Sequence, residues 1–185
     1  MSLTAVLLSG GVDSTACAAF YLGSGHTLAA LFVDYGQAAR QQEEKAARAI
    51  SRFFRIPLGV VRCRGLRSDI PGITRGRNLA LLSMGLSAFA DDAGIIALGV
   101  HVGSAYPDCG ANFIAQVQRI FDLYTQGSVQ VGVPFLEWTK TDIWAFCKRE
   151  GVPVQLTYSC ELGLRQPCGH CRSCRDLEVL SATSH

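Results

Sequence analysis

The segment Leu7-Leu8-Ser9-Gly10-Gly11-Val12-Asp13-Ser14-Thr15 decides the fold, because two glycines in it join an apolar run to an alanine-rich run. The apolar run, residues 5–9, lacks polar alternation, which is typical of a strand covered on both faces. The alanine-rich run, residues 14–21, is predicted to be a helix. A glycine pair at such a junction lets the main chain approach an anion, and the helix start offers free N–H groups. The segment therefore predicts a phosphate-binding turn.

The alternation of strand and helix continues along the chain. Apolar runs predict four further strands at 27–34, 58–63, 95–100 and 129–135, and helices are predicted at 38–54, 78–92, 112–124 and 139–150. The last of these helices begins with a capping pattern, Thr139 followed three residues later by Asp142. The helix at 112–124 places five apolar side chains on one face: Phe113, Val117, Ile120, Phe121 and Tyr124. Strand and helix in alternation indicate βαβ units, so we expect an α/β fold with a doubly wound, mostly parallel five-stranded sheet. The chain changes character from residue 153, with few strands and many cysteines. We therefore expect a phosphate-binding α/β domain over 1–152 and a small C-terminal module over 153–185 packed on it.

Composition limits the classes of partner. Hydrophobic residues make up 49% of the 185 residues and charged ones 17%, which is enough for a sizeable core and argues against disorder. The formal net charge of +2 provides no large basic field, so neither a nucleic acid nor a membrane surface is expected as a partner. No apolar run reaches the roughly 18 residues of a membrane span, and the first residues lack the pattern of a signal peptide. We expect a cytosolic protein whose eight cysteines are mostly reduced.

The glycine loop, defined as residues 9–15, carries further polar groups. Ser9, Ser14 and Thr15 add hydroxyl donors, and Asp13 is expected either to cap the helix or to help hold a magnesium ion that bridges phosphates. The chain has neither the G-x-x-x-x-G-K-[ST] nor the G-x-G-x-x-G pattern, so the loop belongs to another phosphate-binding class. A plain strand-to-helix turn with a good helix cap is the alternative.

The second predicted strand ends in Asp34-Tyr35-Gly36-Gln37. Ligands of doubly wound sheets bind at the carboxyl ends of the strands, so these side chains are predicted to lie beside a bound nucleotide. The alternative is an ordinary strand end before a capped helix.

Four cysteines near the C-terminus have the spacing of a metal site. Cys160, Cys168, Cys171 and Cys174 form the pattern C-x7-C-x2-C-x2-C. Four thiolates make a closed tetrahedral zinc site, which is structural because no coordination position is left for a substrate. An iron–sulfur cluster is the alternative ligand for such a run. Cys17 and Cys147 fall in apolar helical patterns and are predicted to be core residues.

Five motifs in order resemble one enzyme family. The S-G-G-x-D-S form of residues 9–14 resembles the pyrophosphate loop of the ATP-pyrophosphatase superfamily. Together with D-Y-G-Q at 34–37, G-R-N at 76–78, Y-P-D-C at 106–109 and C-G-H-C-R-S-C at 168–174, it resembles the 7-cyano-7-deazaguanine synthase family of the queuosine pathway. The likeness covers nearly the whole chain. It implies an adenine nucleotide alpha hydrolase-like fold that uses ATP, Mg²⁺ and Zn²⁺.

The resemblance also implies a reaction. ATP adenylates the carboxylate of 7-carboxy-7-deazaguanine and pyrophosphate leaves. Ammonia then attacks the mixed anhydride to give an amide, and a second ATP activates the amide oxygen so that loss of AMP leaves a nitrile. In such a reaction the protein contributes positioning and charge stabilisation more than acid–base catalysis.

The resemblance assigns residues to roles. Asp13, Ser14, Arg77 and Lys140 are expected to act in catalysis, because the arginine fork suits phosphate or carboxylate and the lysine follows the fifth strand. The residues expected to bind ATP are Leu8, Ser9, Gly10, Gly11, Val12, Asp13, Ser14, Thr15, Asp34, Tyr35 and Gln37. The residues expected to bind the deazapurine acid are Arg75, Arg77, Asn78, Tyr106 and Asp108. In this set Asn78 is expected to cap the following helix, Tyr106 offers an aromatic face, and Asp108 accepts from the guanine-like N–H edge.

The chain departs from the family in its acceptor half. Arg75 stands where the family usually has proline, and His101 and Ser104 occupy a stretch where the family carries an acidic residue. Two alternatives therefore stay open: a relative that couples the acid to another amine, of a protein or a small molecule, and stops at an amide; and a non-catalytic zinc-knuckle module that binds nucleotide or nucleic acid. Family resemblance also makes a homodimer an expectation.

Overall fold

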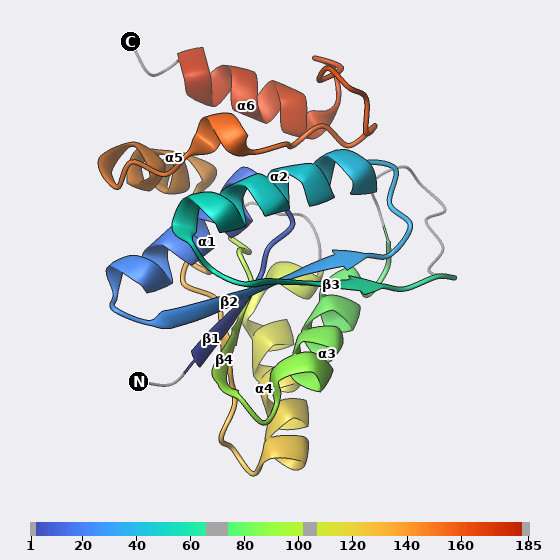
Figure 1. Ribbon diagram of the computed structural model, residues 1–185, viewed down its shortest axis with the longest axis vertical. Coiled ribbons are helices and arrows are strands. Elements are labelled where there is room, and N and C mark those ends of the chain that lie inside the picture. Colours follow the sequence, from blue (N-terminus) through green and yellow to red (C-terminus); the bar gives the residue numbers. More distant parts are fainter. Residues whose placement is uncertain (1–2, 66–73, 102–106, 183–185) are drawn as a thin grey trace.

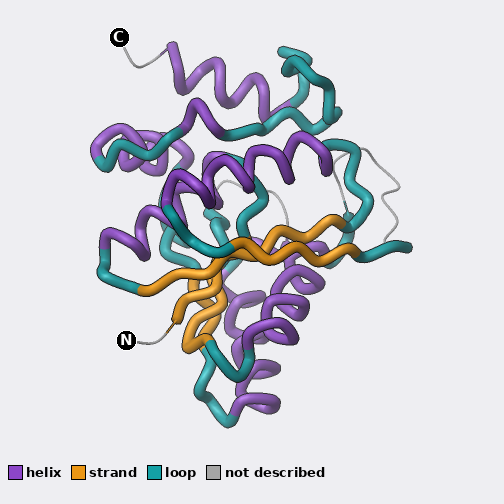
Figure 2. Tube along the Cα trace, in the orientation of Figure 1, coloured by secondary structure: helices purple, strands orange, loops and turns teal. Residues whose placement is uncertain are grey.

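The computed structural model describes residues 3–65, 74–101 and 107–182, and within them a parallel sheet lies between two layers of helices (Figures 1 and 2). The strand order is β3-β2-β1-β4-β5, and every neighbouring pair is parallel. The strands are β1 (Leu3–Leu7), β2 (Thr27–Asp34), β3 (Leu58–Arg62), β4 (Ala93–Ala97) and β5 (Gln130–Gly132). The predicted doubly wound sheet of five strands is confirmed.

The helices divide between the two faces of the sheet. One face packs against α1 (Val12–Gly23), α2 (Arg40–Phe54) and α5 (Lys140–Arg149), and the other against α3 (Arg77–Phe89) and α4 (Ala111–Thr125). The chain ends with α6 (Arg172–Ala182), which lies outermost on the α1, α2 and α5 side (Figure 1). Two short 3-10 helices, η1 (Pro107–Cys109) and η2 (Val154–Leu156), lie in the connections.

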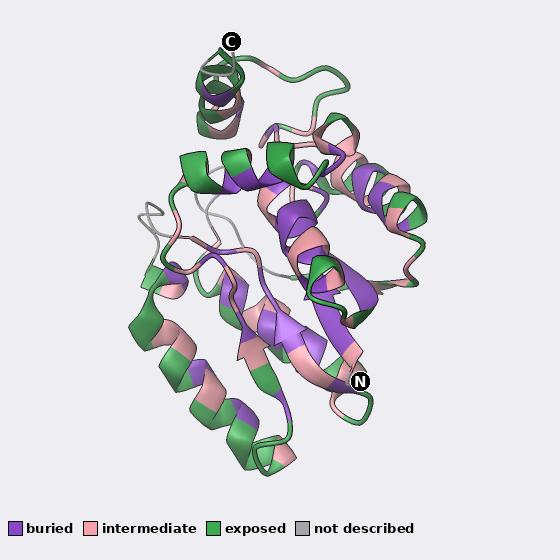
Figure 3. Cartoon of the chain, turned by 90° about the vertical axis from the view of Figure 1, so that its left-hand side faces the viewer, coloured by how far each residue is buried: buried purple, intermediate pink, exposed green. Residues whose placement is uncertain are grey.

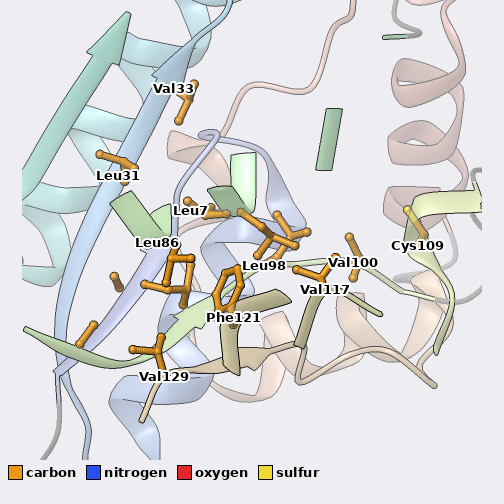
Figure 4. Packing of buried hydrophobic residues seen from close by; sticks show 14 residues of the cluster. Leu7, Leu31, Val33, Leu86, Leu98, Val100, Cys109, Val117, Phe121 and Val129 are labelled. Atoms are coloured by element: carbon orange, nitrogen blue, oxygen red, sulfur yellow. The ribbon is translucent and has the colours of Figure 1, made fainter. Parts of the chain in front are cut away.

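The last residue of β1 and the residue that follows it fill the cores on opposite faces of the sheet. Leu7 packs with Leu31 and Phe121 on the α3 and α4 side (Figure 4), whereas Leu8 packs with Phe32 and Ile50 against α2. Burying a large apolar side chain contributes about 1.5–3 kcal/mol, so a strand covered on both faces is anchored from both sides. Figure 3 shows the same burial running through the centre of the molecule. Cys17 and Cys147 are buried core residues, as predicted.

The point where the strand order reverses lies between β1 and β4. From β1 the chain proceeds through β2 to β3, then crosses to β4 on the other side of β1 and continues to β5. Ligands of doubly wound sheets bind in the crevice at this point, outside the carboxyl ends of the strands. The glycine loop follows β1 there, and Gly99 follows β4 there.

Two glycines allow the main chain to pack closely at this point. Gly10 has φ +85°, and a Cβ added there would lie 2.6 Å from the main-chain oxygen of Glu43 in α2. A Cβ on Gly99 would lie 2.6 Å from the main-chain oxygen of Asp13 in the first turn of α1. Both contacts are with backbone, which cannot rotate away. The loop is therefore held against α2 and β4 by positions that tolerate no side chain.

One expectation from the sequence was wrong. The predicted apolar face of α4 included Ile120 and Tyr124, but Tyr124 is 77% exposed and Ile120 41%, while Val117 and Phe121 are buried. Only a narrow stripe of α4 is covered because α4 packs beside the short edge strand β5. The terminal segment, for which the sequence predicted few strands, contains the helix α6. No helix among the described residues is long and apolar enough to span a membrane.

Replacing Gly10 by alanine should destabilise the fold by about 3 kcal/mol, since it adds a backbone clash to the strain of a left-handed conformation. Gly25→Ala is the matched control: Gly25 has φ +80° and no neighbouring atom within 4 Å of an added Cβ. It should cost only about 1 kcal/mol. Urea denaturation of both variants measures the difference, and equal losses would contradict the packing described for Gly10.

Candidate active site

The glycine loop forms a turn that directs main-chain donors outward. Gly11 is the N-cap of α1, and its carbonyl accepts from the Thr15 N–H at 3.1 Å and the Thr15 Oγ1 at 2.7 Å. The first N–H groups of a helix have no acceptor within the helix, so those of Val12, Asp13 and Ser14 are available to an anion. Gly11, and not Asp13, therefore caps α1. Thr15 is fully buried and holds the turn from inside.

An ion pair joins the loop to α5. The Nζ of Lys140 lies 2.6 Å from the Oδ2 of Asp13, and the Nε2 of His101 lies 3.9 Å from the same oxygen. The other oxygen of Asp13, Oδ1, is buried and has no hydrogen-bond partner among the described residues. The pair brings together two residues that the sequence assigned to catalysis although 127 positions separate them.

Lys140 owes its place to the start of α5. Thr139 and Asp142 form the predicted capping box: the Thr139 N–H donates to the Asp142 Oδ2 at 2.8 Å, and the Asp142 N–H donates to the Thr139 Oγ1 at 3.2 Å. Hydrogen bonds from the hydroxyl and then the N–H of Thr139 lower the pKa of Asp142, which keeps the cap charged. Lys140 is the first residue after this cap, so its direction is set by the helix start.

Two adjoining cavities open at the loop. The smaller, of about 210 Å³, lies between β1, β2 and α3, and its walls include Leu31, Val33 and Leu81. The larger, of about 300 Å³, extends from the loop past Lys140 to α6. Ser9, Gly11, Asp13, Glu43, Arg77 and Gly99 border both cavities. The site can therefore hold a flat apolar group in one cavity and charged groups at the junction.

Arg77 and Glu43 face each other at this junction. Burial raises the pKa of Tyr35, and the positive charge of Arg77 opposes that rise. Burial likewise raises the pKa of Glu43, although Gln37 donates a hydrogen bond of 2.7 Å to its carboxylate and Arg77 also favours its charged form. Sequence reasoning missed Glu43, because an acidic residue in the first turn of a helix usually faces solvent.

Most of the predicted ATP residues line the two cavities. Those that do are Leu8, Ser9, Gly11, Val12, Asp13, Ser14, Tyr35 and Gln37. Gly10, Thr15 and Asp34 do not. Asp34 accepts from the Gly36 N–H at 3.0 Å and lies 4.0 Å from the Nε of Arg62, in a separate cavity at the ends of β2 and β3. Its carboxylate turns away from the loop because these local partners hold it.

The predicted substrate residues are only partly brought together. Arg77 and Asn78 line the site, whereas Arg75 and Asp108 do not. Gly76 is the N-cap of α3, so the expectation that Asn78 caps this helix was wrong. Instead the Asn78 N–H donates to the Asp108 Oδ2 at 3.1 Å, which commits one carboxylate oxygen of Asp108 to the helix start. The predicted contact of Tyr106 falls outside the described residues.

The four cysteines converge, as predicted. Their Sγ atoms all lie within 4.8 Å of one another, and those of Cys168 and Cys174 are 3.9 Å apart. A tetrahedral zinc ion with Zn–S bonds of about 2.3 Å places its sulfurs roughly 3.8 Å apart, so the arrangement fits a single ion. Burial opposes ionisation of Cys160, but N–H donors from Cys168 and Leu162 outweigh it and lower its pKa to about 6. A thiolate is the form that binds metal.

The segment before the cysteines is tied to the glycine loop. The Tyr158 N–H donates to the Gly10 carbonyl at 2.9 Å, and the Tyr158 hydroxyl donates to the Leu164 carbonyl at 2.6 Å. Gly163, with φ +67°, packs against the main chain of Ala38 so closely that an added Cβ would overlap it. Cys160 lies between these two attachments. The cysteine cluster and the glycine loop are therefore parts of one packed unit.

Comparison with known proteins identifies the family of the chain. A family model described as queuosine biosynthesis protein QueC matches residues 4–70 and 68–178. A 7-cyano-7-deazaguanine synthase from Synechococcus sp. (strain RCC307) is 33% identical over 94% of this chain and 91% of its own length. Another, from Methanosphaerula palustris, is 34% identical over 91% of this chain and 89% of its own length.

Solved structures share the fold at lower identity. The U34-tRNA thiolase NcsA from Methanococcus maripaludis has a TM-score of 0.61 and 15% identity, over 98% of this chain and 65% of the thiolase. A 4-thiouridine synthetase, solved with RNA and ATP, has a TM-score of 0.52 and 16% identity, over 98% of this chain and 50% of that chain. At these identities the likeness concerns the fold alone.

The raised pKa of Glu43 predicts a pH-dependent stability difference. A carboxyl whose folded pKa lies above its unfolded value of 4.5 contributes stability at low pH and loses it as pH rises through the folded pKa. In Glu43→Gln this loss disappears, so the variant's free energy of unfolding relative to wild type should increase between pH 4 and pH 7. Urea denaturation at both pH values measures it. A difference between variant and wild type that stays constant, or that is larger at pH 4 than at pH 7, would contradict the raised pKa of Glu43.

Proposed function

Because the chain belongs to the QueC family of queuosine biosynthesis proteins, we propose that it is an ATP-dependent carbon–nitrogen ligase that converts 7-carboxy-7-deazaguanine into 7-cyano-7-deazaguanine. The observation that carries the proposal is the glycine loop at the reversal of the sheet. Its outward N–H groups, Arg77 and the Asp13–Lys140 pair meet where two cavities join. Among the described residues that line the two cavities, none favours an amine other than ammonia.

The first half-reaction turns a poor electrophile into a good one. The substrate carboxylate attacks the α-phosphorus of ATP, the bond to the β-phosphate oxygen breaks, and pyrophosphate leaves with its electron pair. Negative charge grows on the departing diphosphate. The N–H groups of Val12, Asp13 and Ser14 and the ammonium of Lys140 are the donors that stabilise this charge.

The second half-reaction forms the amide and then the nitrile. Ammonia attacks the acyl carbon of the mixed anhydride, AMP leaves, and one proton is released, which gives the amide. The amide oxygen then attacks a second ATP, pyrophosphate leaves again, and loss of AMP together with the remaining N–H protons gives the nitrile. Both adenylations need the same phosphate contacts, so one loop serves both steps.

The smaller cavity suits the adenine base. Leu31, Val33 and Leu81 provide apolar surface, and Tyr35 and Gln37 stand at the polar edge. A base in this cavity directs its phosphates toward the loop, because the two cavities share the Ser9 and Gly11 border. Arg77 borders both cavities, which suits contact with the α-phosphate and with the acid in turn.

Two metals complete the proposal. Asp13 Oδ1, buried and without a hydrogen-bond partner among the described residues, is suited to Mg²⁺, which would neutralise phosphate charge when bound. The four-thiolate cluster is suited to structural Zn²⁺, whose tetrahedral shell it fills. The zinc ion would hold in place the segment whose Tyr158 N–H donates to the Gly10 carbonyl.

Pyrophosphate release tests the function. Purified protein with ATP, Mg²⁺, ammonium and 7-carboxy-7-deazaguanine should release pyrophosphate and form a product whose mass is that of the nitrile. Lys140→Met should slow the release about 10²- to 10³-fold, the effect of removing one preorganised charge donor, whereas Lys148→Met on the exposed end of α5 should change it less than two-fold. No pyrophosphate from the wild type, or an amide as the only product, would contradict the proposal.

Removal of zinc should weaken nucleotide binding together with stability, because Tyr158 links the cysteine segment to Gly10. Metal analysis of the purified protein should find zinc, and a strong chelator should lower both the melting temperature and the affinity for α,β-methylene-ATP. Restoring zinc should restore both. A tail that melts while nucleotide affinity stays unchanged would show that the module is independent of the loop.

A further inference from the structure

One face of α6 borders the larger cavity. Its cavity-lining residues, at spacings of one helical turn, are Arg172, Ser173, Asp176, Leu177 and Leu180. Because residues three and four apart share a helix face, this lining is a continuous side of α6 and not a chance approach of its end. The polar members stand at the start of the helix and the leucines follow toward its end.

The start of α6 is fixed in place by two attachments. Cys174 belongs to the cysteine cluster, and the Glu161 Oε1 accepts from the Ser173 N–H at 3.1 Å and the Ser173 Oγ at 2.8 Å. Further along, Leu177 packs into the core cluster that contains Trp144 and Ile143 of α5. α6 is thus a rigid wall, which is the condition for a wall to select among ligands.

The four carboxylates of this cavity differ in what they already bind. Asp13 is paired with Lys140, Glu43 accepts from Gln37, and Glu161 accepts from Ser173.

Asp176 is the remaining acid. Within residues 3–65, 74–101 and 107–182 its carboxylate has no hydrogen bond or ion pair, and it is exposed to the cavity. A carboxylate whose oxygens are all available can accept two parallel N–H donors.

The larger cavity carries different groups on its two sides. Lys140 pairs with Asp13 of the glycine loop, whereas Arg172 and Asp176 stand one turn apart on α6. Trp144 and Leu177 add apolar surface to the same lining. 7-Carboxy-7-deazaguanine carries groups that can pair with Lys140 and with Asp176. Its carboxylate lies on one side of a flat fused ring, and its N1–H and 2-amino donors lie on the opposite edge.

We propose that α6 forms the binding wall for the deazapurine acid and that Asp176 accepts hydrogen bonds from its N1–H and 2-amino groups, making Asp176 a specificity-determining residue. This inference rests on the proposed function and replaces the predicted role of Asp108, which lines neither cavity and has one carboxylate oxygen committed to the start of α3. Trp144 supplies the face against which the ring lies, and the acid's carboxylate then points to the loop.

The test measures discrimination between the acid and its analogue without the 2-amino group, 7-carboxy-7-deazahypoxanthine. Wild type should prefer the natural acid in kcat/KM. Asp176→Asn should raise the KM for the natural acid about 10- to 100-fold, as expected for lost hydrogen bonds to a charged acceptor, and should reduce the preference to less than three-fold. The KM for ATP should stay within two-fold, because the nucleotide contacts lie at the other end of the site. Calorimetric titration of the acid, with α,β-methylene-ATP present, should show the same loss of affinity.

Glu178→Gln is the matched control, because Glu178 is exposed on α6 and does not line the cavity. Glu178→Gln should leave the kcat/KM for both acids and the KM for ATP unchanged. Zinc content and melting temperature of each variant show that α6 remains in place. If wild type is active and Asp176→Asn keeps its preference for the natural acid, the inference about α6 is wrong although the proposed function stands. If wild type releases no pyrophosphate with the acid and binds neither acid in calorimetry, the proposed function and this inference fall together.

Discussion

The arrangement of the site depends on one constraint, the close contact of main chain with main chain around the glycine loop. At Gly10 the loop touches the backbone of α2, and at Gly99 the end of β4 touches the first turn of α1. Neither contact leaves space for a Cβ. The turn is consequently formed before any ligand arrives, and its N–H groups need no reorganisation to meet a phosphate.

Segments far apart in the chain complete this turn. Lys140 of α5 pairs with Asp13, Tyr158 donates to the Gly10 carbonyl, and Arg77 at the start of α3 borders both cavities. The C-terminal cysteines contribute indirectly, because they hold the segment that reaches the loop and the start of α6. The small terminal module is thereby a wall of the site as well as a structural appendage.

Local patterns in the sequence predicted those structural features that depend on residues close together in the chain. The apolar runs predicted all five strands, the Thr139 and Asp142 pair predicted a capping box, and cysteine spacing predicted convergence on one ion. These features are encoded within a few residues of one another. The ends of the strands were less well predicted, because the last residues pair only where a neighbouring strand is present.

Long-range packing decided what the sequence could not predict. Asp34 ends a strand beside the loop, yet Gly36 and Arg62 hold its carboxylate in another cavity. Asp108 is 30 positions from Asn78 but caps the same helix start. Glu43 resembles a solvent-facing helix residue and is partly buried because the loop packs on α2. The family resemblance predicted the chemistry, and the structure places some of the residues expected to take part in it away from the two cavities.

Binding of nucleotide phosphates at the pre-formed glycine loop is tested most directly by an amide NMR titration of the 15N-labelled protein with α,β-methylene-ATP and Mg²⁺. We expect the largest shifts at the amides of Gly11, Val12, Asp13 and Ser14. Unchanged loop amides, with the shifts gathered instead around Arg62 and Arg64, would contradict it.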